Sequence, residues 1–272
     1  MVEYVIANAT VVPVRENPSE GAEQLTQLLF GEMCEVLDRL PRWTKIRSTI
    51  DGQEGWVDFK MISLSDEATR LKGDEAVVAT PMVAATPMDG GADLLFTLGT
   101  RLPNYSHGTF EVLGQQYLID PTCVSTAQRS TGAADLQQND LQRSDLATIA
   151  QSLLNAPYLW GGKNLMGIDC SGFTQVVYAA MGVNLLRNAR EQMTQGELIP
   201  CLSHAQPGDL AFFDHADRDP KATNISHVGL LLSSTEIIHC SGCVHIDSID
   251  EEGIHLADGS LTHHLVQIKR YL

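Results

Sequence analysis

Apolar residues at helical spacing follow Asp169, and this segment carries the clearest hydrophobic pattern in the chain. These apolar positions are Phe173, Val176, Val177 and Ala180. They recur every three to four residues and define one face of a helix. Asp169 is a favourable N-cap and Gly182 a favourable left-handed C-cap, so the pattern predicts a helix from about Cys170 to Met181.

The N-terminal part of the chain has a different pattern, in which short runs rich in β-branched and aromatic residues are separated by turns such as Asp51-Gly52. This pattern predicts a small all-β barrel over residues 1–64. A weaker copy follows, because Leu95-Phe96 repeats Leu29-Phe30 at an offset of 66. The repeat predicts a divergent second barrel over residues 74–121.

Residues 122–143 are polar and rich in turn formers, so we expect a surface connector. Ser144 is a plausible N-cap for a helix that continues through Leu154. Short buried strands follow the predicted helices, which is typical of an α+β domain over residues 144–272.

Cys170 would lie in the first turn of its helix, where unpaired amides and the helix dipole favour thiolate over thiol. His227 begins an apolar run and His239 ends the next one, and the intervening turn at 233–235 would bring their imidazoles together. The order matches the nucleophile, base and orienter of papain-like chemistry, with Cys170, His227 and His239 in these roles. The alternative reading is a small buried residue at the start of a helix and structural histidines at strand ends.

The charge and cysteine content of the chain limit its possible binding partners and metals. The 272 residues carry a net charge of −16, which disfavours nucleic acid and anionic membranes as partners. No apolar run is long enough to span a bilayer. The six scattered cysteines indicate reduced thiols, and His239-Cys240-x-x-Cys243 lacks the further ligands that zinc requires. We therefore expect no metal and no cofactor.

Six sequence blocks then point to a family. They are Tyr158-Leu159-Trp160-Gly161-Gly162, Asp169-Cys170-Ser171-Gly172-Phe173, Arg187-Asn188-Ala189-Arg190-Glu191-Gln192, Pro207-Gly208-Asp209-Leu210, His227-Val228-Gly229 and Ile237-Ile238-His239-Cys240-Ser241-Gly242. With them, residues 145–272 resemble the NlpC-type, papain-like cysteine peptidases. The nearest likeness is to the subgroup that carries bacterial SH3-like domains in front. The resemblance implies an α+β papain-like peptidase domain preceded by two small all-β SH3-like barrels.

The resemblance also implies roles for further residues. The amide of Cys170 and the hydroxyl of Tyr158 would stabilise the oxyanion. Asp169, Ser171 and Trp160 would contact the L-Ala end of a cell-wall peptide. An acidic residue of the first barrel would bind the same amine, and Glu54 is the expected one.

The expected function is a cysteine endopeptidase that cuts the γ-D-glutamyl–L-diamino acid bond of murein peptides with a free N-terminal L-Ala. The alternatives are an amidase or acyltransferase on the same scaffold, or a wall-binding SH3 protein with broader murein hydrolase activity. We expect a monomer whose partner is the murein peptide. The first residues lack a signal-peptide pattern, so we expect a cytoplasmic protein; a removed signal would instead indicate the periplasm or secretion.

Overall fold

The computed structural model describes residues 2–65, 76–126, 136–215 and 224–272. Its contacts divide the chain into two compact units, Met1–Gln128 with Trp160–Leu165, and Arg129–Leu159 with Met166–Leu272. We call them the N-terminal unit and the C-terminal unit. In the described parts of the chain, no helix combines the length and apolar character needed to cross a membrane.

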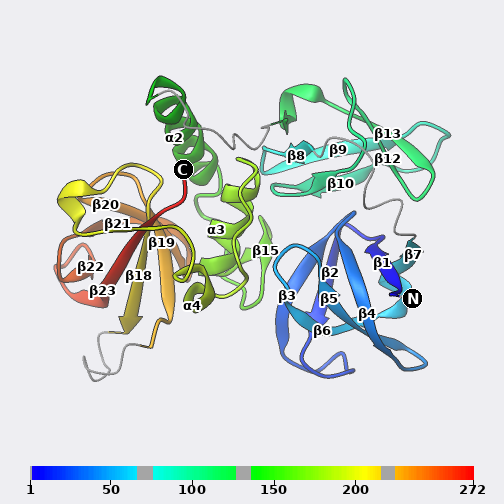
Figure 1. Cartoon of the computed structure of the whole chain (residues 1–272), viewed down its shortest axis with the longest axis horizontal. Helices are drawn as coiled ribbons and strands as arrows, with labels where there is room; N and C mark the ends of the chain where they lie inside the picture. Colours follow the sequence, from blue (N-terminus) through cyan, green and yellow to red (C-terminus); the bar gives the residue numbers. More distant parts are fainter. Residues whose placement is uncertain (1, 66–75, 127–135, 216–223) are drawn as a thin grey trace. The chain divides into compact units, whose positions relative to one another are not determined.

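The N-terminal unit begins with one antiparallel sheet of seven strands in the order β3-β2-β6-β5-β4-β1-β7 (Figure 1). The strands are β1 (Tyr4–Ala7), β2 (Val11–Arg15), β3 (Gln24–Leu29), β4 (Met33–Arg39), β5 (Trp43–Ser48), β6 (Glu54–Asp58) and β7 (Ile62–Ser65), with a 3-10 helix at Phe59–Met61. Alternate residues, such as Val12 and Val14 of β2, are buried in its core. The β-branched runs and turns of the sequence thus predicted an all-β unit here, but residues 2–14 form two strands, β1 and β2, where one run was expected.

The second half of this unit has a four-stranded sheet, β10-β9-β13-β12, and a three-stranded sheet, β11-β8-β14. Its strands are β8 (Ala76–Val78), β9 (Met82–Pro87), β10 (Leu94–Thr97), β11 (Arg101–Leu102), β12 (Thr109–Val112), β13 (Gln115–Ile119) and β14 (Val124–Ser125), with a 3-10 helix at Pro121–Cys123. Phe110 stacks on Tyr117 with ring centroids 5.0 Å apart, and Phe30 of the first sheet stacks on Phe96 at 4.9 Å. The two halves thus share one aromatic core.

The C-terminal unit combines helices with a second seven-stranded antiparallel sheet, ordered β17-β23-β18-β19-β20-β21-β22 (Figure 1). The helices are α2 (Leu136–Gln151), α3 (Cys170–Ala179) and α4 (Ala189–Gln192), with a 3-10 helix at Leu202–His204. The strands are β16 (Gly167–Ile168), β17 (Glu197–Ile199), β18 (Leu210–His215), β19 (His227–Leu231), β20 (Glu236–Ser241), β21 (Cys243–Ile249), β22 (Gly253–His255) and β23 (Leu261–Arg270). The two-residue strand β15 (Lys163–Asn164) belongs to the N-terminal unit. Helix α3 packs against β19 and β20.

Helix α3 matches its prediction closely. Asp169 caps it with a side-chain oxygen that accepts from the Gly172 amide at 2.7 Å, and Gly182 has a φ of 75° just beyond its end. The helix ends at Ala179 and not at Met181. Its apolar residues are buried together with its polar ones, so the whole helix is interior.

The start of α2 was predicted wrongly. Ser144 does not cap a helix but lies inside α2, which begins at Leu136 and ends at Gln151. The residues before Ser144 are mostly good helix formers. Their helix propensity extends α2 into the segment predicted to be a connector. The start of the expected connector is also structured, since it holds the end of the 3-10 helix at Pro121–Cys123 and strand β14. Residues 127–135 of the connector lie outside the described residues, as do 66–75 between the two predicted barrels.

Candidate active site

Cys170 is the first residue of α3 and is buried. Burial, followed by the charge of Asp169, raises the pKa of its thiol to about 12. The backbone amides of Val228 and Ser171 hydrogen-bond the sulfur and lower the pKa, but by less than burial raises it. Burial therefore favours the thiol in the free protein, against the expectation that the helix start favours the thiolate. A base must take the thiol proton.

His227 is the predicted base, and it lies one residue before a residue that contacts the sulfur. It is the first residue of β19, and the next residue, Val228, holds the Cys170 sulfur through its amide. The Nε2 atom of His227 lies 2.8 Å from Nδ1 of His239. The predicted approach of the two imidazoles is thus observed, across the antiparallel pair β19–β20.

Gly229 makes this approach possible. It pairs directly with His239 in the β19–β20 register. A Cβ atom at position 229 would lie 2.8 Å from the Cβ atom of His239 and 2.6 Å from Cδ1 of Ile237. These distances are shorter than real side chains allow, so the glycine of the His-Val-Gly block leaves room for the supporting histidine.

Asp247 of β21 continues the chain of hydrogen bonds. Its Oδ2 atom lies 3.1 Å from Nε2 of His239. Because a carboxylate only accepts, His239 donates from Nε2. Burial lowers the pKa of His239 and favours its neutral form, so its Nδ1 atom accepts from Nε2 of His227. This arrangement leaves a basic lone pair on Nδ1 of His227, as proton transfer from a thiol requires.

Tyr158 has an electrostatic interaction with Cys170 that raises the pKa of its phenol, with burial as the larger cause. The phenol therefore keeps its proton and can donate a hydrogen bond. The amide of Cys170 occupies the first helical position, where it has no partner within the helix. Both groups have the donor chemistry that the sequence assigned to an oxyanion site, and this role stays a prediction.

Asp169 has a partner that the sequence did not indicate. Both of its carboxylate oxygens bind Arg187, at 3.1 and 2.6 Å, and Arg187 also donates to the Ser171 hydroxyl at 2.8 Å. Arg187 is almost completely buried. The ion pair neutralises Asp169, so the carboxylate offers hydrogen bonds and no unpaired charge to a ligand amine. The expected roles of Asp169 and Ser171 in substrate binding stay predictions.

Trp160 belongs to the N-terminal unit. Its indole Nε1 donates to Oε1 of Glu23 at 2.8 Å, and its backbone oxygen accepts from Nε2 of Gln24 at 3.1 Å. The ring is 60% exposed, which leaves much of it accessible to a ligand. Gly161 has a φ of 74°, and a Cβ atom there would lie 2.5 Å from the Gln24 carbonyl oxygen. The double-glycine block therefore permits close approach to β3.

Two buried side chains of the first sheet hold the same segment. The Oε1 atom of Glu32 lies 3.2 Å from Nζ of Lys163. Gln27 accepts from the Lys163 amide at 2.9 Å and from Nδ2 of Asn164 at 2.8 Å. Residues 160–165 are thus anchored on the first barrel by buried polar contacts, although they lie just before Asp169 in the sequence.

Glu54 lies on an exposed part of β6 and pairs with Arg47 at 2.6 Å and Lys45 at 3.5 Å. The hydrogen bond from Arg47 lowers the pKa of this carboxyl. Glu23 of the same barrel contacts Trp160 through its carboxylate. The expected role of Glu54 in binding the substrate amine stays a prediction.

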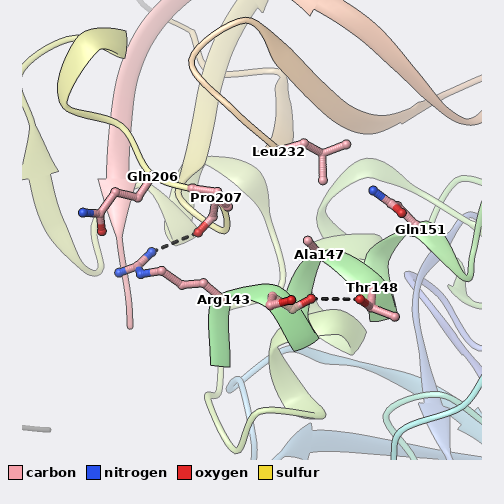
Figure 2. A pocket seen from close by; sticks show the side chains of 8 residues that line it. Arg143, Ala147, Thr148, Gln151, Gln206, Pro207 and Leu232 are labelled. Atoms are coloured by element: carbon pink, nitrogen blue, oxygen red, sulfur yellow. Dashed lines mark hydrogen bonds between the residues drawn. The ribbon is translucent and has the colours of Figure 1, made fainter. Parts of the chain in front are cut away.

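A pocket of about 480 Å³ lies elsewhere in the C-terminal unit (Figure 2). Its lining residues are Arg143, Ser144, Ala147, Thr148, Gln151, Gln206, Pro207 and Leu232. Arg143 donates to the Pro207 carbonyl at 3.0 Å and pairs with the buried Asp209 at 3.4 Å. Since the lining contains none of the cysteine and histidine groups described above, this pocket is separate from the candidate site.

Sequence reasoning missed Asp247, His245 and His263 near the two histidines. The Nε2 atom of His245 lies 3.1 Å from the same Asp247 oxygen, and His263 stacks on His227 with centroids 4.5 Å apart. His245 and Asp247 are two residues apart on β21, and that spacing places them on one strand face. The sequence spacing thus indicates that His245 and Asp247 share a strand face. Only the pairing of β20 with β21 shows that His239 lies beside them.

A buried cysteine at a helix start, beside a histidine–histidine–aspartate chain, defines a thiol-dependent hydrolase by its chemistry. Residues 155–258 match the NlpC/P60 family, and residues 10–63 match the bacterial SH3 domain. The chain belongs to the NlpC/P60 family of hydrolases. The match at 10–63 confirms the prediction of an SH3-like domain at the N-terminus.

Curated relatives extend this similarity over most of the chain. The chain is 35% identical over 279 aligned positions to dipeptidyl-peptidase 6 of Lysinibacillus sphaericus, covering 90% of this chain and 93% of the relative. It is 27% identical over 227 residues to the γ-D-glutamyl-L-lysine dipeptidyl-peptidase of Bacillus cereus, covering 79% of this chain and 66% of the relative. The chain thus spans just under two thirds of the latter protein's length.

A solved structure shows the same fold. The crystal structure of an NlpC/P60 family protein from Bacillus cereus superimposes with a TM-score of 0.80 and covers 99% of both chains at 21% sequence identity. The likeness therefore extends through both units and is not limited to the segment that carries Cys170 and the histidines.

Proposed function

We propose that the protein is a cysteine endopeptidase that cleaves the γ-D-glutamyl–L-diamino acid bond of free murein peptides. The observation that carries the proposal is the hydrogen-bonded chain His227–His239–Asp247, which begins one residue before the Val228 amide that hydrogen-bonds the Cys170 sulfur. The names of the relatives, a γ-D-glutamyl-L-lysine dipeptidyl-peptidase and dipeptidyl-peptidase 6, support this substrate class. The papain-like arrangement and a divergent second SH3-like barrel over β8–β14 belong to the same proposal.

The proposed reaction has two steps, and His227 moves the proton in both. In the first step Nδ1 of His227 takes the Cys170 proton, and the thiolate attacks the γ-carbonyl carbon of D-Glu. The Cys170 amide and the Tyr158 hydroxyl hydrogen-bond the oxyanion. The diamino acid leaves with the proton from His227, and a thioester remains. Water then attacks the thioester with His227 as base, which releases L-Ala-γ-D-Glu and restores the thiol.

Neutral Cys170 suits this mechanism because the thiolate forms only when His227 has taken the proton. Its thiol is ordinarily protonated at neutral pH, since burial raises its pKa to about 12. The imidazolium of His227 is then stabilised through His239 by the charge of Asp247. The separated charges form in a buried site, where a fixed carboxylate acts more strongly than it would in water.

For the free amine of L-Ala we propose Glu23, with Trp160 beside it in the N-terminal unit; the expected roles of Asp169 and Ser171 in substrate binding stay separate proposals. Glu23 is an acid in contact with Trp160, and Asp169 is neutralised by Arg187. An ammonium group that loses water needs an opposite charge, and Glu23 has one to offer. The first barrel would then bind substrate and would not serve only to attach the protein to the wall.

The test compares three substrates with the full-length protein: free L-Ala-γ-D-Glu-L-Lys, its N-acetyl derivative and insoluble sacculi. We expect cleavage of the free tripeptide, a loss of about 10²-fold or more in kcat/KM on acetylation, and no release from sacculi. The Glu23→Gln variant should lose most of the discrimination against the acetylated peptide, whereas Glu54→Gln, the matched control on β6, should keep it. Equal rates on free and acetylated peptide would favour an amidase of broader specificity.

A further inference from the structure

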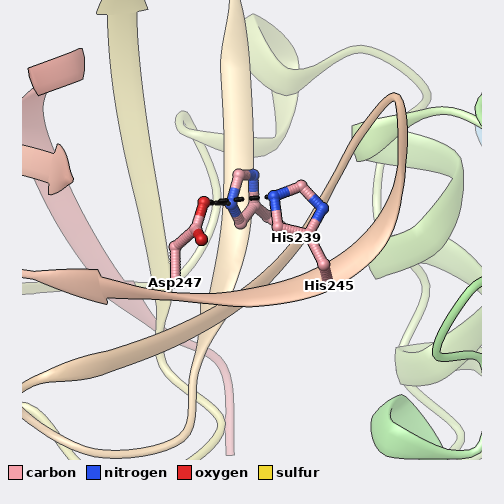
Figure 3. A group of neighbouring side chains, drawn as sticks. All are labelled: His239, His245 and Asp247. Carbon is pink, nitrogen blue, oxygen red and sulfur yellow. Dashed lines mark hydrogen bonds and ion pairs between the residues drawn. The ribbon is translucent and has the colours of Figure 1, made fainter. Parts of the chain in front are cut away.

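Three side chains of the C-terminal unit bring metal-ligating atoms together behind the supporting histidine. The ligand atoms of His239, His245 and Asp247 all lie within 4.8 Å of one another. The Nε2 atoms of both histidines lie 3.1 Å from the same oxygen, Oδ2 of Asp247 (Figure 3). This face of His239 points away from His227, which is bound by the opposite ring nitrogen, Nδ1.

We propose that His239, His245 and Asp247 form a binding site for a zinc-class divalent cation, and that the bound cation switches off peptide hydrolysis. Two imidazole nitrogens and one carboxylate are a ligand set that zinc prefers, with water as the fourth ligand. Metal–ligand bonds of about 2.0–2.2 Å in a tetrahedron separate the ligand atoms by about 3.3 Å. The two distances of 3.1 Å to Asp247 are therefore close to those that coordination requires.

The cation can reach this site from solvent. The side chains of His245 and Asp247 are 32% and 14% exposed, whereas that of His239 is 1% exposed. His245 can therefore adjust by side-chain rotation, while His239 is fixed by packing in β20. The net charge of −16 also favours cation binding over anion binding.

Inhibition follows from the position of protons on two rings. A metal on Nε2 of His239 displaces the proton that this atom donates to Asp247, so neutral His239 carries its proton on Nδ1. Nδ1 then donates to Nε2 of His227, and the His227 proton moves to its own Nδ1 atom. The number of protons on the two rings is unchanged. His227 can no longer accept the Cys170 proton, because the nitrogen that would accept it is occupied.

The inhibitory half of this proposal rests on the proposed function, in which His227 is the base for Cys170. The binding half does not, since it concerns only β20 and β21. The two halves therefore need separate measurements, one of binding and one of hydrolysis. The sequence reading, which expected no metal, considered only His239-Cys240-x-x-Cys243 and did not use His245 or Asp247.

Binding is measured by calorimetric titration of ZnCl₂ into full-length Cys170→Ala, which removes the thiol as a competing ligand. A second substitution, Cys201→Ser, removes the exposed thiol that lies 3.0 Å from Nδ1 of His204. We expect one zinc site per chain. The His245→Gln substitution should lower its affinity for zinc at least about 10-fold. The matched control is His255→Gln, which removes a histidine that lies 2.9 Å from Asp250 and should leave this site intact.

Hydrolysis is measured on the free tripeptide with Cys201→Ser as the reference, with and without ZnCl₂ and after addition of EDTA. We expect zinc to inhibit the reference reversibly. His245→Gln in the same background, with each rate normalised to its own zinc-free rate, should need at least about 10-fold more zinc for half inhibition. His255→Gln should behave as the reference.

Three results would overturn the proposal. They are an absence of zinc binding by the Cys170→Ala, Cys201→Ser protein, equal binding after His245→Gln, and equal zinc inhibition of the reference and His245→Gln. The last result would place the inhibitory metal on Cys170 and His227. A zinc-free protein that does not cleave the tripeptide but still binds zinc through His245 would instead refute the proposed function and leave the metal site standing.

Discussion

His227 and His239 meet edge to face, with Nε2 of the first 2.8 Å from Nδ1 of the second and their ring planes 82° apart. In this arrangement Nε2 of His227 donates one hydrogen bond to Nδ1 of His239. Because His239 in turn donates to Asp247, the direction of that hydrogen bond is set from β21. The protonation of the base is thus controlled by a carboxylate that does not touch it.

Asp247→Asn tests this control. We expect kcat to fall by about 10- to 100-fold, less than for a carboxylate that contacts the base directly, because Asp247 acts through His239. The acid limb of kcat/KM should move to lower pH, since loss of the negative charge makes His227 easier to deprotonate. An unchanged pH profile with a proportional loss of folded protein would assign Asp247 a structural role only. His245→Gln, assayed without metal, is the control.

Gly229→Ala tests the space beside His239. The added Cβ atom would meet atoms of His239 and Ile237 at less than 3.0 Å, so β19 and β20 must separate. We expect a loss of about 1–3 kcal/mol in the free energy of unfolding and a large loss of kcat. Gly21→Ala, at a position with no atom within 4 Å of the new Cβ, should be near neutral in both urea denaturation and activity.

Thiol labelling tests the pKa of Cys170 in the free protein. Hydrogen bonds from Ser203 and His204 lower the pKa of the Cys201 thiol, whereas burial raises that of Cys170 to about 12. Iodoacetamide at neutral pH should therefore modify Cys201 before Cys170, as read by peptide mass spectrometry. Faster modification of Cys170 in the Cys201→Ser protein than of Cys201 in the wild type would show that the thiolate forms without substrate.

Arg187→Met tests the buried ion pair with Asp169. Removing the guanidinium leaves the buried Asp169 carboxylate without this opposite charge, so we expect a loss of about 3–5 kcal/mol in the free energy of unfolding. Arg39→Met is the matched control, because Arg39 and Glu3 form an equally short but exposed pair at 2.6 Å. The free energy of unfolding of Arg39→Met should fall by no more than about 1 kcal/mol. Similar losses in urea denaturation of the two variants would contradict a special role for burial.

The predictable part of this protein is the part that local sequence signals determine. The N-cap at Asp169, the turn at Gly182 and the apolar runs of β19 and β20 each depend on neighbouring residues, and each is observed. The beginning of α2 was missed because helix formers without a clear apolar face look like a polar loop.

The unpredicted parts depend on register and on pairing across the fold. Asp247 reaches His239 only because β20 and β21 pair in the register that places His239 opposite His245. Arg187 was part of a recognised block, but its buried contact with Asp169 joins residues from separate elements. The thiol pKa was misjudged for a related reason, since helix position can be read from sequence and the extent of burial cannot.

Product analysis with and without the Cys170 thiol tests whether Cys170 is the nucleophile for a γ-D-glutamyl bond. Metal-free full-length protein and Cys170→Ala are incubated with L-Ala-γ-D-Glu-L-Lys, and the products are identified by mass spectrometry. We expect the wild type to produce L-Ala-γ-D-Glu and L-Lys. The folded Cys170→Ala protein should cleave the tripeptide more slowly by about 10⁴-fold or more. Comparable cleavage by Cys170→Ala, or release of L-Ala in place of L-Lys, would contradict these expectations.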